Sequence, residues 1–156
     1  MNSEPLREHI INLLTKQEAH VDVRSALEDF PANLRGRKPE GAPHTPWELL
    51  EHMRIAQWDI LQFSLDAKHK SPKWPEDYWP KSDSPETARA WQKSVQQFLA
   101  DLDAMCEVIR DTRRDLFAPI SHGSGQTLLR EALLVADHNS YHLGQLVLVR
   151  RILVRE

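Results

Sequence analysis

Long hydrophobic runs, cysteine and glycine are all scarce in this sequence. No apolar run approaches the ~20 residues that a membrane-spanning helix needs, so we expect no membrane segment. The single cysteine, Cys106, cannot form an internal disulfide, and folding should therefore not depend on an oxidising compartment. Only five glycines occur in 156 residues, and polar and apolar residues do not alternate as they do in strands.

Charge of one sign is not concentrated anywhere in the chain. The net charge is −3, from 20 basic and 23 acidic residues. The densest basic cluster, RGRK at 35–38, is too short for a nucleic-acid interface, so we expect no nucleic-acid partner. The first ten residues, MNSEPLREHI, lack the basic and then apolar pattern of a secretory signal. These features favour a cytoplasmic protein.

The chain does carry the 3.6-residue period of amphipathic helices. Four helices are predicted: 5–29 with a bend near 19–21, 46–65, 84–110, and 127 almost to the end. Thr45, Pro46 and Glu48 form a capping pattern at the start of the second. The connections, roughly 14 to 18 residues long, exceed the usual 2–8 of bundles and leave the helix order open. We predict an all-α fold, a single domain over 1–156 that is a four-helix bundle with long connections.

Histidines occupy the predicted inward faces of two of these helices. On the last helix, a stripe lies within about 60 degrees of His138 and comprises Glu131, Val135, His142, Gln145 and Val149. On the second helix, the inward stripe comprises Leu49, His52, Ala56, Ile60 and Phe63, whereas the residues expected to face away are Arg54, Gln57 and Ser64. The last helix is also apolar on a second side, which favours a homodimer, through Leu129, Leu133, Ala136, Leu143 and Val147.

The histidines allow two interpretations. Three neutral imidazoles facing one point could bind zinc, nickel, copper or iron and leave a coordination position open. Alternatively, His52, His138 and His142 are core residues hydrogen-bonded to carbonyls or carboxylates. Two carboxylates, Asp59 and Glu131, lie two turns from His52 and His138 respectively. Each could orient a histidine, move protons, act as a fourth ligand that favours iron or manganese, or simply pair with an arginine.

An aromatic segment rich in proline, with Trp74, Tyr78 and Trp79, connects the second and third predicted helices. It could form a wall over a bound ligand, or a hydrophobic cap at one end of the bundle. His44 and His20 could approach the mouth of the site, although a structural or surface role is expected for each.

Three segments resemble the DinB/YfiT-like family of metalloenzymes. They are HTPWELLEHMRIAQWDIL at 44–61, WPEDYWP at 74–80, and QTLLREALLVADHNSYHLGQLVLVRR at 126–151. The resemblance implies a four-helix bundle in which a divalent metal, commonly assigned as zinc or nickel, is coordinated by His52, His138 and His142. Some members are transferases or isomerases that use low-molecular-weight thiols such as mycothiol or bacillithiol.

The function expected from the resemblance is that of a divalent-metal-dependent enzyme acting on a small molecule. The reaction would be thiol transfer, with a low-molecular-weight thiol as partner, or metal-assisted hydrolysis. Two alternatives stay open: a non-catalytic bundle whose metal is structural, and a helical protein-interaction module whose core histidines bind no metal.

Overall fold

The computed structural model describes residues 4–155, so both ends of the predicted domain, residues 1–3 and 156, lie outside it. Its helices are α1 (Glu4–Thr15), α2 (Val23–Leu27), α3 (Pro46–Leu65), α4 (Ala88–Arg110) and α5 (Leu128–Arg155), with short 3-10 turns η1 (Ala32–Leu34) and η2 (Glu76–Tyr78). The described residues contain no strand, only an isolated bridge between Pro119 and Thr127. The all-α prediction is confirmed.

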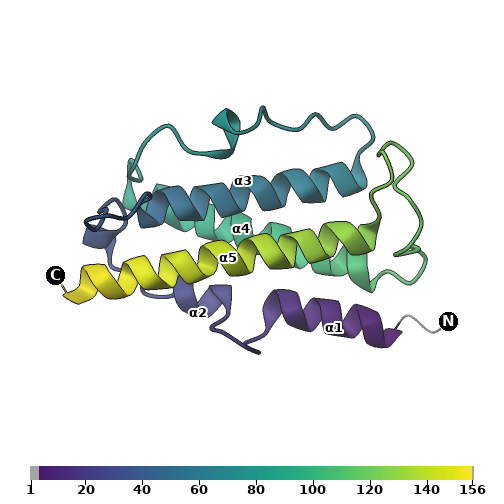
Figure 1. Ribbon diagram of the computed structural model, residues 1–156, viewed down its shortest axis with the longest axis horizontal. Coiled ribbons are helices and arrows are strands. Elements are labelled where there is room, and N and C mark those ends of the chain that lie inside the picture. Colours follow the sequence, from purple (N-terminus) through teal and green to yellow (C-terminus); the bar gives the residue numbers. More distant parts are fainter. Residues whose placement is uncertain (1–3, 156) are drawn as a thin grey trace.

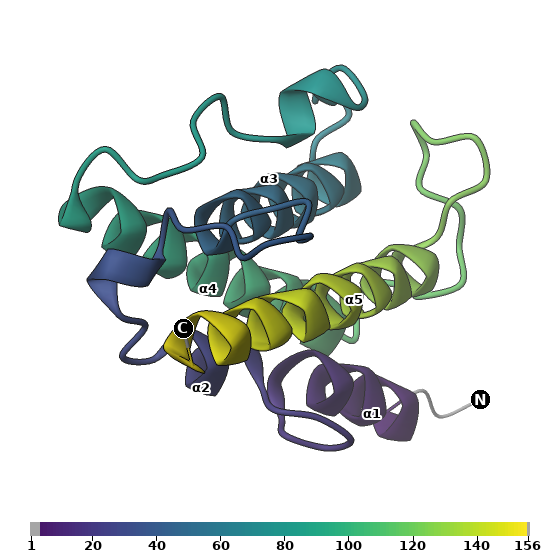
Figure 2. The same ribbon diagram turned by 60° about the vertical axis from the view of Figure 1, so that its left-hand side comes forward.

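The helices form a bundle with a crossover. In Figures 1 and 2, α3 and α4 run in the same direction, whereas α1 and α5 run the opposite way. α3 contacts α4 and α5, and α1 contacts the same two helices from the other side. Because α3 and α4 are parallel, the connection 66–87 has to return along the length of the bundle, and it does so over α3 (Figure 1). This topology explains why that connection is long.

Threonine caps fix the starts of the three long helices. The hydroxyl of Thr45 accepts the backbone N–H of Glu48 at 3.2 Å, and the Glu48 side chain accepts the N–H of Thr45 at 2.7 Å. Thr87 and Thr127 cap α4 and α5 in the same way, with distances of 3.1 Å each. Caps of this kind satisfy backbone donors that the helix leaves unpaired.

The first predicted helix is broken, which corrects the prediction of one bent helix over 5–29. Residues 16–22 separate α1 from α2. Asp22 has an extended backbone and caps α2, because its carboxylate accepts from the backbone N–H of Ser25 at 3.0 Å and from the Ser25 hydroxyl at 2.7 Å. A residue in this conformation cannot continue the preceding helix.

The polar side of α3 is more buried than the sequence indicates. Gln57 and Ser64 are only 1% and 6% exposed, so the prediction that they face away from the core is wrong. The reason is that α3 packs against two helices at once, and α4 covers the side that α5 leaves free. Gln57 donates to the backbone carbonyl of Phe98 on α4 at 2.7 Å.

The second apolar side of α5 is covered largely within the chain. Ala136 and Leu143 are 5% and 2% exposed, since α1 and α2 pack on this helix. Leu133, at 45%, is the exposed member of the predicted dimer face. The homodimer stays a prediction, but most of the surface on which it rested is already buried by the chain's own helices.

Across residues 4–155, none of the helices combines the length and the apolar character that crossing a membrane requires.

Candidate metal centre

Three histidines from two helices meet in the bundle. His52 lies on α3, and His138 and His142 lie one turn apart on α5, which runs antiparallel to α3. One ring nitrogen of each lies within 4.8 Å of those of the other two. His52 and His142 are 2% and 8% exposed, and His138 is half-buried. In the described part of the chain, no aspartate, glutamate or cysteine joins this group.

Hydrogen bonds on the outer side fix the tautomers of two rings. The Nδ1 of His52 lies 2.8 Å from the backbone carbonyl oxygen of Tyr78, and the Nδ1 of His142 lies 2.9 Å from Oε1 of Gln145. Both oxygens only accept, so each Nδ1 carries the hydrogen and each Nε2 keeps its lone pair. The arrangement matches the outer hydrogen bonds that metal-bound histidines usually make.

The third ring completes a set suited to a cation. Nε2 of His138 lies 3.1 Å from Nε2 of His52. Two nitrogens bound to one zinc ion at about 2.0–2.1 Å with tetrahedral angles lie about 3.3 Å apart. Because the His52 nitrogen carries a lone pair, the contact is favourable only with a hydrogen or a cation between the two atoms. The donor set therefore fits a divalent metal.

Two buried amides, those of Gln57 and Asn139, lie near His138. Gln57, held by the Phe98 carbonyl, accepts from Nδ2 of Asn139 at 2.8 Å. The other end of this amide, the buried oxygen Oδ1 of Asn139, has no hydrogen-bond partner. The buried Nδ1 of His138 has no hydrogen-bond partner either. The side chain of Asn139 nevertheless raises the pKa of the His138 ring, as a nearby acceptor does. An Nδ1–H directed at this oxygen would leave Nε2 free to bind a metal.

All three rings are held in the neutral form. Burial lowers the pKa of His138 to about 4, and the neighbouring His142 and His52 lower it further. Burial is also the largest cause of the lowered pKa of His52 and of His142. Neutral imidazole is the form that coordinates metals, so these rings are ready to bind at neutral pH.

The connection 66–87 forms one wall of the group. The indole of Trp79 stacks on the ring of His52, with the ring centroids 3.9 Å apart and the planes parallel. It also stacks on the ring of His44, with 4.0 Å between the ring centroids. Trp74, by contrast, is 68% exposed. Of the predicted aromatic wall, Trp79 and the backbone of Tyr78 contact the histidines, whereas Trp74 contacts Tyr78 from outside.

The two predicted carboxylates lie outside the histidine group. Asp59 accepts from the Tyr78 hydroxyl at 2.6 Å and pairs with Nε2 of His69 at 2.7 Å. It is thus linked to His52 through Tyr78, whose carbonyl holds that ring. Glu131 is 2% exposed and forms an ion pair with Arg130 at 2.7 Å. The predicted catalytic roles of Asp59 and Glu131 stay predictions.

Several residues that surround the histidine group are not predicted from the sequence. Gln145 lies on the predicted inward stripe, three residues after His142, and this spacing could have marked it as a partner. The Tyr78 carbonyl, and the pair of Gln57 and Asn139, depend on contacts between distant segments, for which the sequence carries no local signal. His20 bonds to Ser140 and lies outside the group.

The family comparison agrees with this geometry. A model of the DinB superfamily matches residues 17–146, which include all three histidines. The chain belongs to the DinB superfamily. It has no significant match among curated proteins or among solved structures.

The lowered histidine pKa values predict that acid destabilises the metal-free protein. An unfolded histidine has a pKa of about 6.5, whereas His138 in the folded chain has a pKa of about 4. The unfolded chain therefore binds more protons between these values, so stability is fully present above about pH 6.5 and is lost as the pH falls toward 4. Urea unfolding in the presence of a chelator should show a loss on the order of 3 kcal/mol from this ring.

His138→Gln is the matched variant for this measurement. It should flatten the pH dependence between pH 6.5 and 4.5, while titration of the carboxylates remains common to both proteins. An identical pH dependence in the two proteins would contradict the assignment of a neutral, half-buried His138.

Proposed function

We propose that this DinB-superfamily chain is a divalent-metal-dependent enzyme that acts on a small molecule. The ligands would be the Nε2 atoms of His52, His138 and His142. The observation that carries the proposal is the convergence of three neutral imidazoles, two of which have their outer nitrogens engaged by oxygen acceptors. The 3.1 Å contact between the Nε2 atoms of His52 and His138 is also close to the separation of two ligands of one zinc ion.

The ligand set favours zinc or nickel over iron or manganese. The described group consists of nitrogens alone, whereas iron and manganese sites usually include carboxylates. Three protein ligands also leave at least one coordination position for water or substrate, as in catalytic zinc sites. A structural zinc site, by contrast, has four protein ligands.

In such a site, the metal would supply the chemistry, and the residues around it would control access of water and substrate. A bound divalent cation supplies Lewis acidity, which lowers the pKa of a coordinated water or thiol. Trp79 covers His52 and keeps water from that side of the ring. Tyr141, 65% exposed and in edge contact with His142 at 4.8 Å between centroids, lies on the solvent side of the group. A small molecule would approach from there.

Thiol transfer is the reaction that the site favours over hydrolysis. Hydrolysis usually requires a general base beside the metal, and no carboxylate among the described residues joins the histidines. A thiol does not require such a general base, because coordination to the metal alone can convert it to the nucleophilic thiolate at neutral pH. The partner of this proposal is therefore a low-molecular-weight thiol, together with an electrophilic acceptor.

Metal analysis of protein purified without a polyhistidine tag tests the ligand assignment. We expect about one divalent ion per chain, because three imidazoles converge on one point. His138→Ala should lose the ion, whereas the matched variant His9→Ala, which changes an exposed histidine of α1, should retain it. Equal metal content in both variants, or none in the wild type, would contradict the site.

Cobalt substitution extends this test to the function. A small thiol added to the cobalt form should produce a thiolate-to-cobalt charge-transfer band, and the zinc form should accelerate transfer of that thiol to an electrophile. A bound metal whose spectrum responds to neither thiol nor imidazole, with no turnover, would favour the non-catalytic alternative.

Asp59 has a positioning role in this proposal. It holds Tyr78, and the Tyr78 carbonyl holds the His52 ring in its metal-binding tautomer. Asp59→Ala should weaken zinc affinity by less than the 10- to 100-fold that is usual when a ligand's direct hydrogen-bond partner is removed, because Asp59 acts on His52 only through Tyr78. Competition with a chromophoric chelator at fixed pH would measure it.

Asp83→Asn, which changes an exposed aspartate of the same connection, is the control and should bind zinc as the wild type does. Unchanged zinc affinity in a folded Asp59→Ala protein would rule out the positioning role and leave the three ligands in place.

A further inference from the structure

Within residues 4–155, one side of α5 is left uncovered by the rest of the chain. In Figures 1 and 2, α5 lies at the front of the bundle, and no other segment is drawn across it. Large apolar side chains stand on this side, since Tyr141 is 65% and Leu148 59% exposed. The surface differs from the second apolar side of α5, which α1 and α2 cover. An exposed apolar helix side of this kind is typical of an interaction surface.

Three residues spaced by seven form a line along the uncovered side. They are Asp137, Gly144 and Arg151, all exposed. Positions seven apart drift by only about 20° around a helix, so the three side chains point the same way. An acidic and a basic residue therefore lie two turns before and two turns after a central glycine.

The glycine has no explanation inside the chain. Glycine in a helix interior costs about 1 kcal/mol relative to alanine. A Cβ built on Gly144 would meet no atom within 4 Å, so no neighbour in the described part of the chain requires its absence. The distance between two packed helices depends on the side chains at their contact, and glycine permits the closest approach. Gly144 is thus suited to a helix that approaches from outside.

The two charges lack partners in their own chain. Neither Asp137 nor Arg151 forms an ion pair or hydrogen bond with another described residue. They lie about 21 Å apart along the axis, at a rise of about 1.5 Å per residue, and cannot reach one another. A two-fold axis at Gly144 would place Asp137 of each copy against Arg151 of the other, because such an interface is self-complementary. Arg155, one turn further on, adds positive charge at that end.

The exposed apolar residues obey the same symmetry. Tyr141 and Leu148 each follow a residue of the line by four positions, so both are rotated about 40° to the same flank. A two-fold axis perpendicular to antiparallel helices keeps each flank on its own side. Tyr141 of one copy would therefore lie beside Leu148 of the other, and this contact would occur twice.

The apolar contacts and the charges have different roles. Burial of Tyr141 and Leu148 would supply the affinity. Exposed ion pairs add little affinity, but they select the orientation of the helices. A parallel, in-register pair would bring Asp137 against Asp137 and Arg151 against Arg151, whereas the antiparallel pair joins opposite charges.

We propose that α5 pairs antiparallel with α5 of a second copy of this chain, about a two-fold axis at Gly144. The second copy would then lie against Tyr141, whose ring is in edge contact with His142 at 4.8 Å between centroids. It would form one border of the solvent side of the metal centre, and a small molecule would enter beside it. The pairing requires no bound metal and does not rest on the proposed function.

Charge reversal tests the pairing by sedimentation equilibrium of untagged, metal-free protein at low ionic strength. The wild type should form dimers as its concentration rises. Arg151→Asp and Asp137→Arg should each weaken association about tenfold or more, because symmetry brings like charges together twice. An equimolar mixture of the two variants should associate again, because the acidic copy then meets the basic copy at both contacts.

Two further variants control for net charge and locate the axis. Arg89→Asp makes the same charge change at an exposed residue of α4 and should dimerise as the wild type does. Gly144→Cys should give a disulfide-linked dimer on mild oxidation, because the two copies of this position face one another on the axis. The native Cys106 is buried and should not contribute.

Three results would overturn the proposal: a wild type that stays monomeric up to near-millimolar concentration, equal association of Arg151→Asp and Arg89→Asp, or a mixture no more associated than its separate components. None of them would bear on the metal centre, because zinc content is measured independently on the same proteins.

Discussion

Three imidazoles that converge on one point, two of them buried and one half-buried, are the constraint on which the site depends. Burial lowers the pKa of His138 to about 4 and keeps the rings unprotonated at neutral pH, so the contact between Nε2 of His138 and Nε2 of His52 needs a hydrogen or a cation between the two atoms. The outer contacts hold this arrangement: the Tyr78 carbonyl and Gln145 fix two rings, and the amides of Gln57 and Asn139 lie beside the third. This geometry places three ring nitrogens where they could hold one divalent ion.

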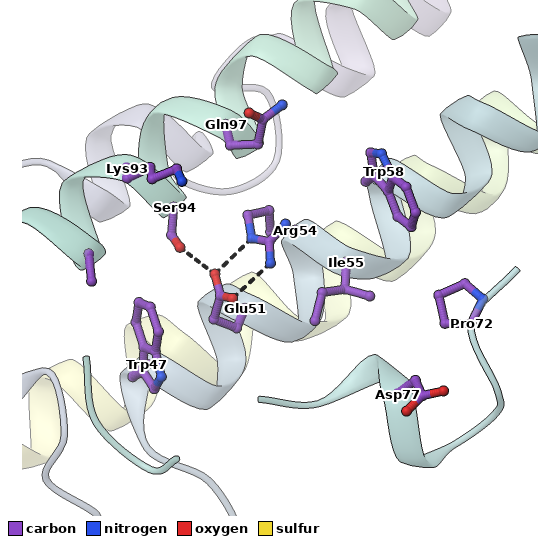
Figure 3. Close-up of a pocket in the computed structure, with 11 residues that line it drawn as sticks. Trp47, Glu51, Arg54, Ile55, Trp58, Pro72, Asp77, Lys93, Ser94 and Gln97 are labelled. Carbon is purple, nitrogen blue, oxygen red and sulfur yellow. Dashed lines mark hydrogen bonds and ion pairs between the residues drawn. The ribbon is translucent and has the colours of Figure 1, made fainter. Parts of the chain in front are cut away.

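The crossover topology explains how the site acquires its outer wall. Parallel α3 and α4 require the connection 66–87 to run back over α3, as Figure 1 shows. That connection delivers the Tyr78 carbonyl and the Trp79 ring to His52 on one side. On the other side, Pro72 and Asp77 of the connection line a groove along α3 whose opposite side is α4 (Figure 3). This segment therefore forms one wall of the candidate metal centre, and Asp59 holds it on α3 through Tyr78 and His69.

Local patterns in the sequence predict the helices and the histidine group, and contacts between distant segments decide the rest. The four-residue spacing of His138 and His142 is enough to place both on one face, and Thr45 with Glu48 marks the start of the helix that carries His52. The break after α1 is missed, because the capping role of Asp22 competes with a helical period that continues past it. Gln57 is misplaced since periodicity shows only one buried stripe, whereas α3 packs on two helices. No residue pattern reports a backbone carbonyl such as that of Tyr78.

X-ray absorption spectroscopy at the zinc edge, on zinc-loaded protein without a tag, tests the central claim most directly. The account predicts three imidazole nitrogens at about 2.0–2.1 Å from the ion, with the remaining position held by a light atom from water or buffer. A zinc shell with two imidazoles or fewer, or one filled by four protein ligands, would contradict it.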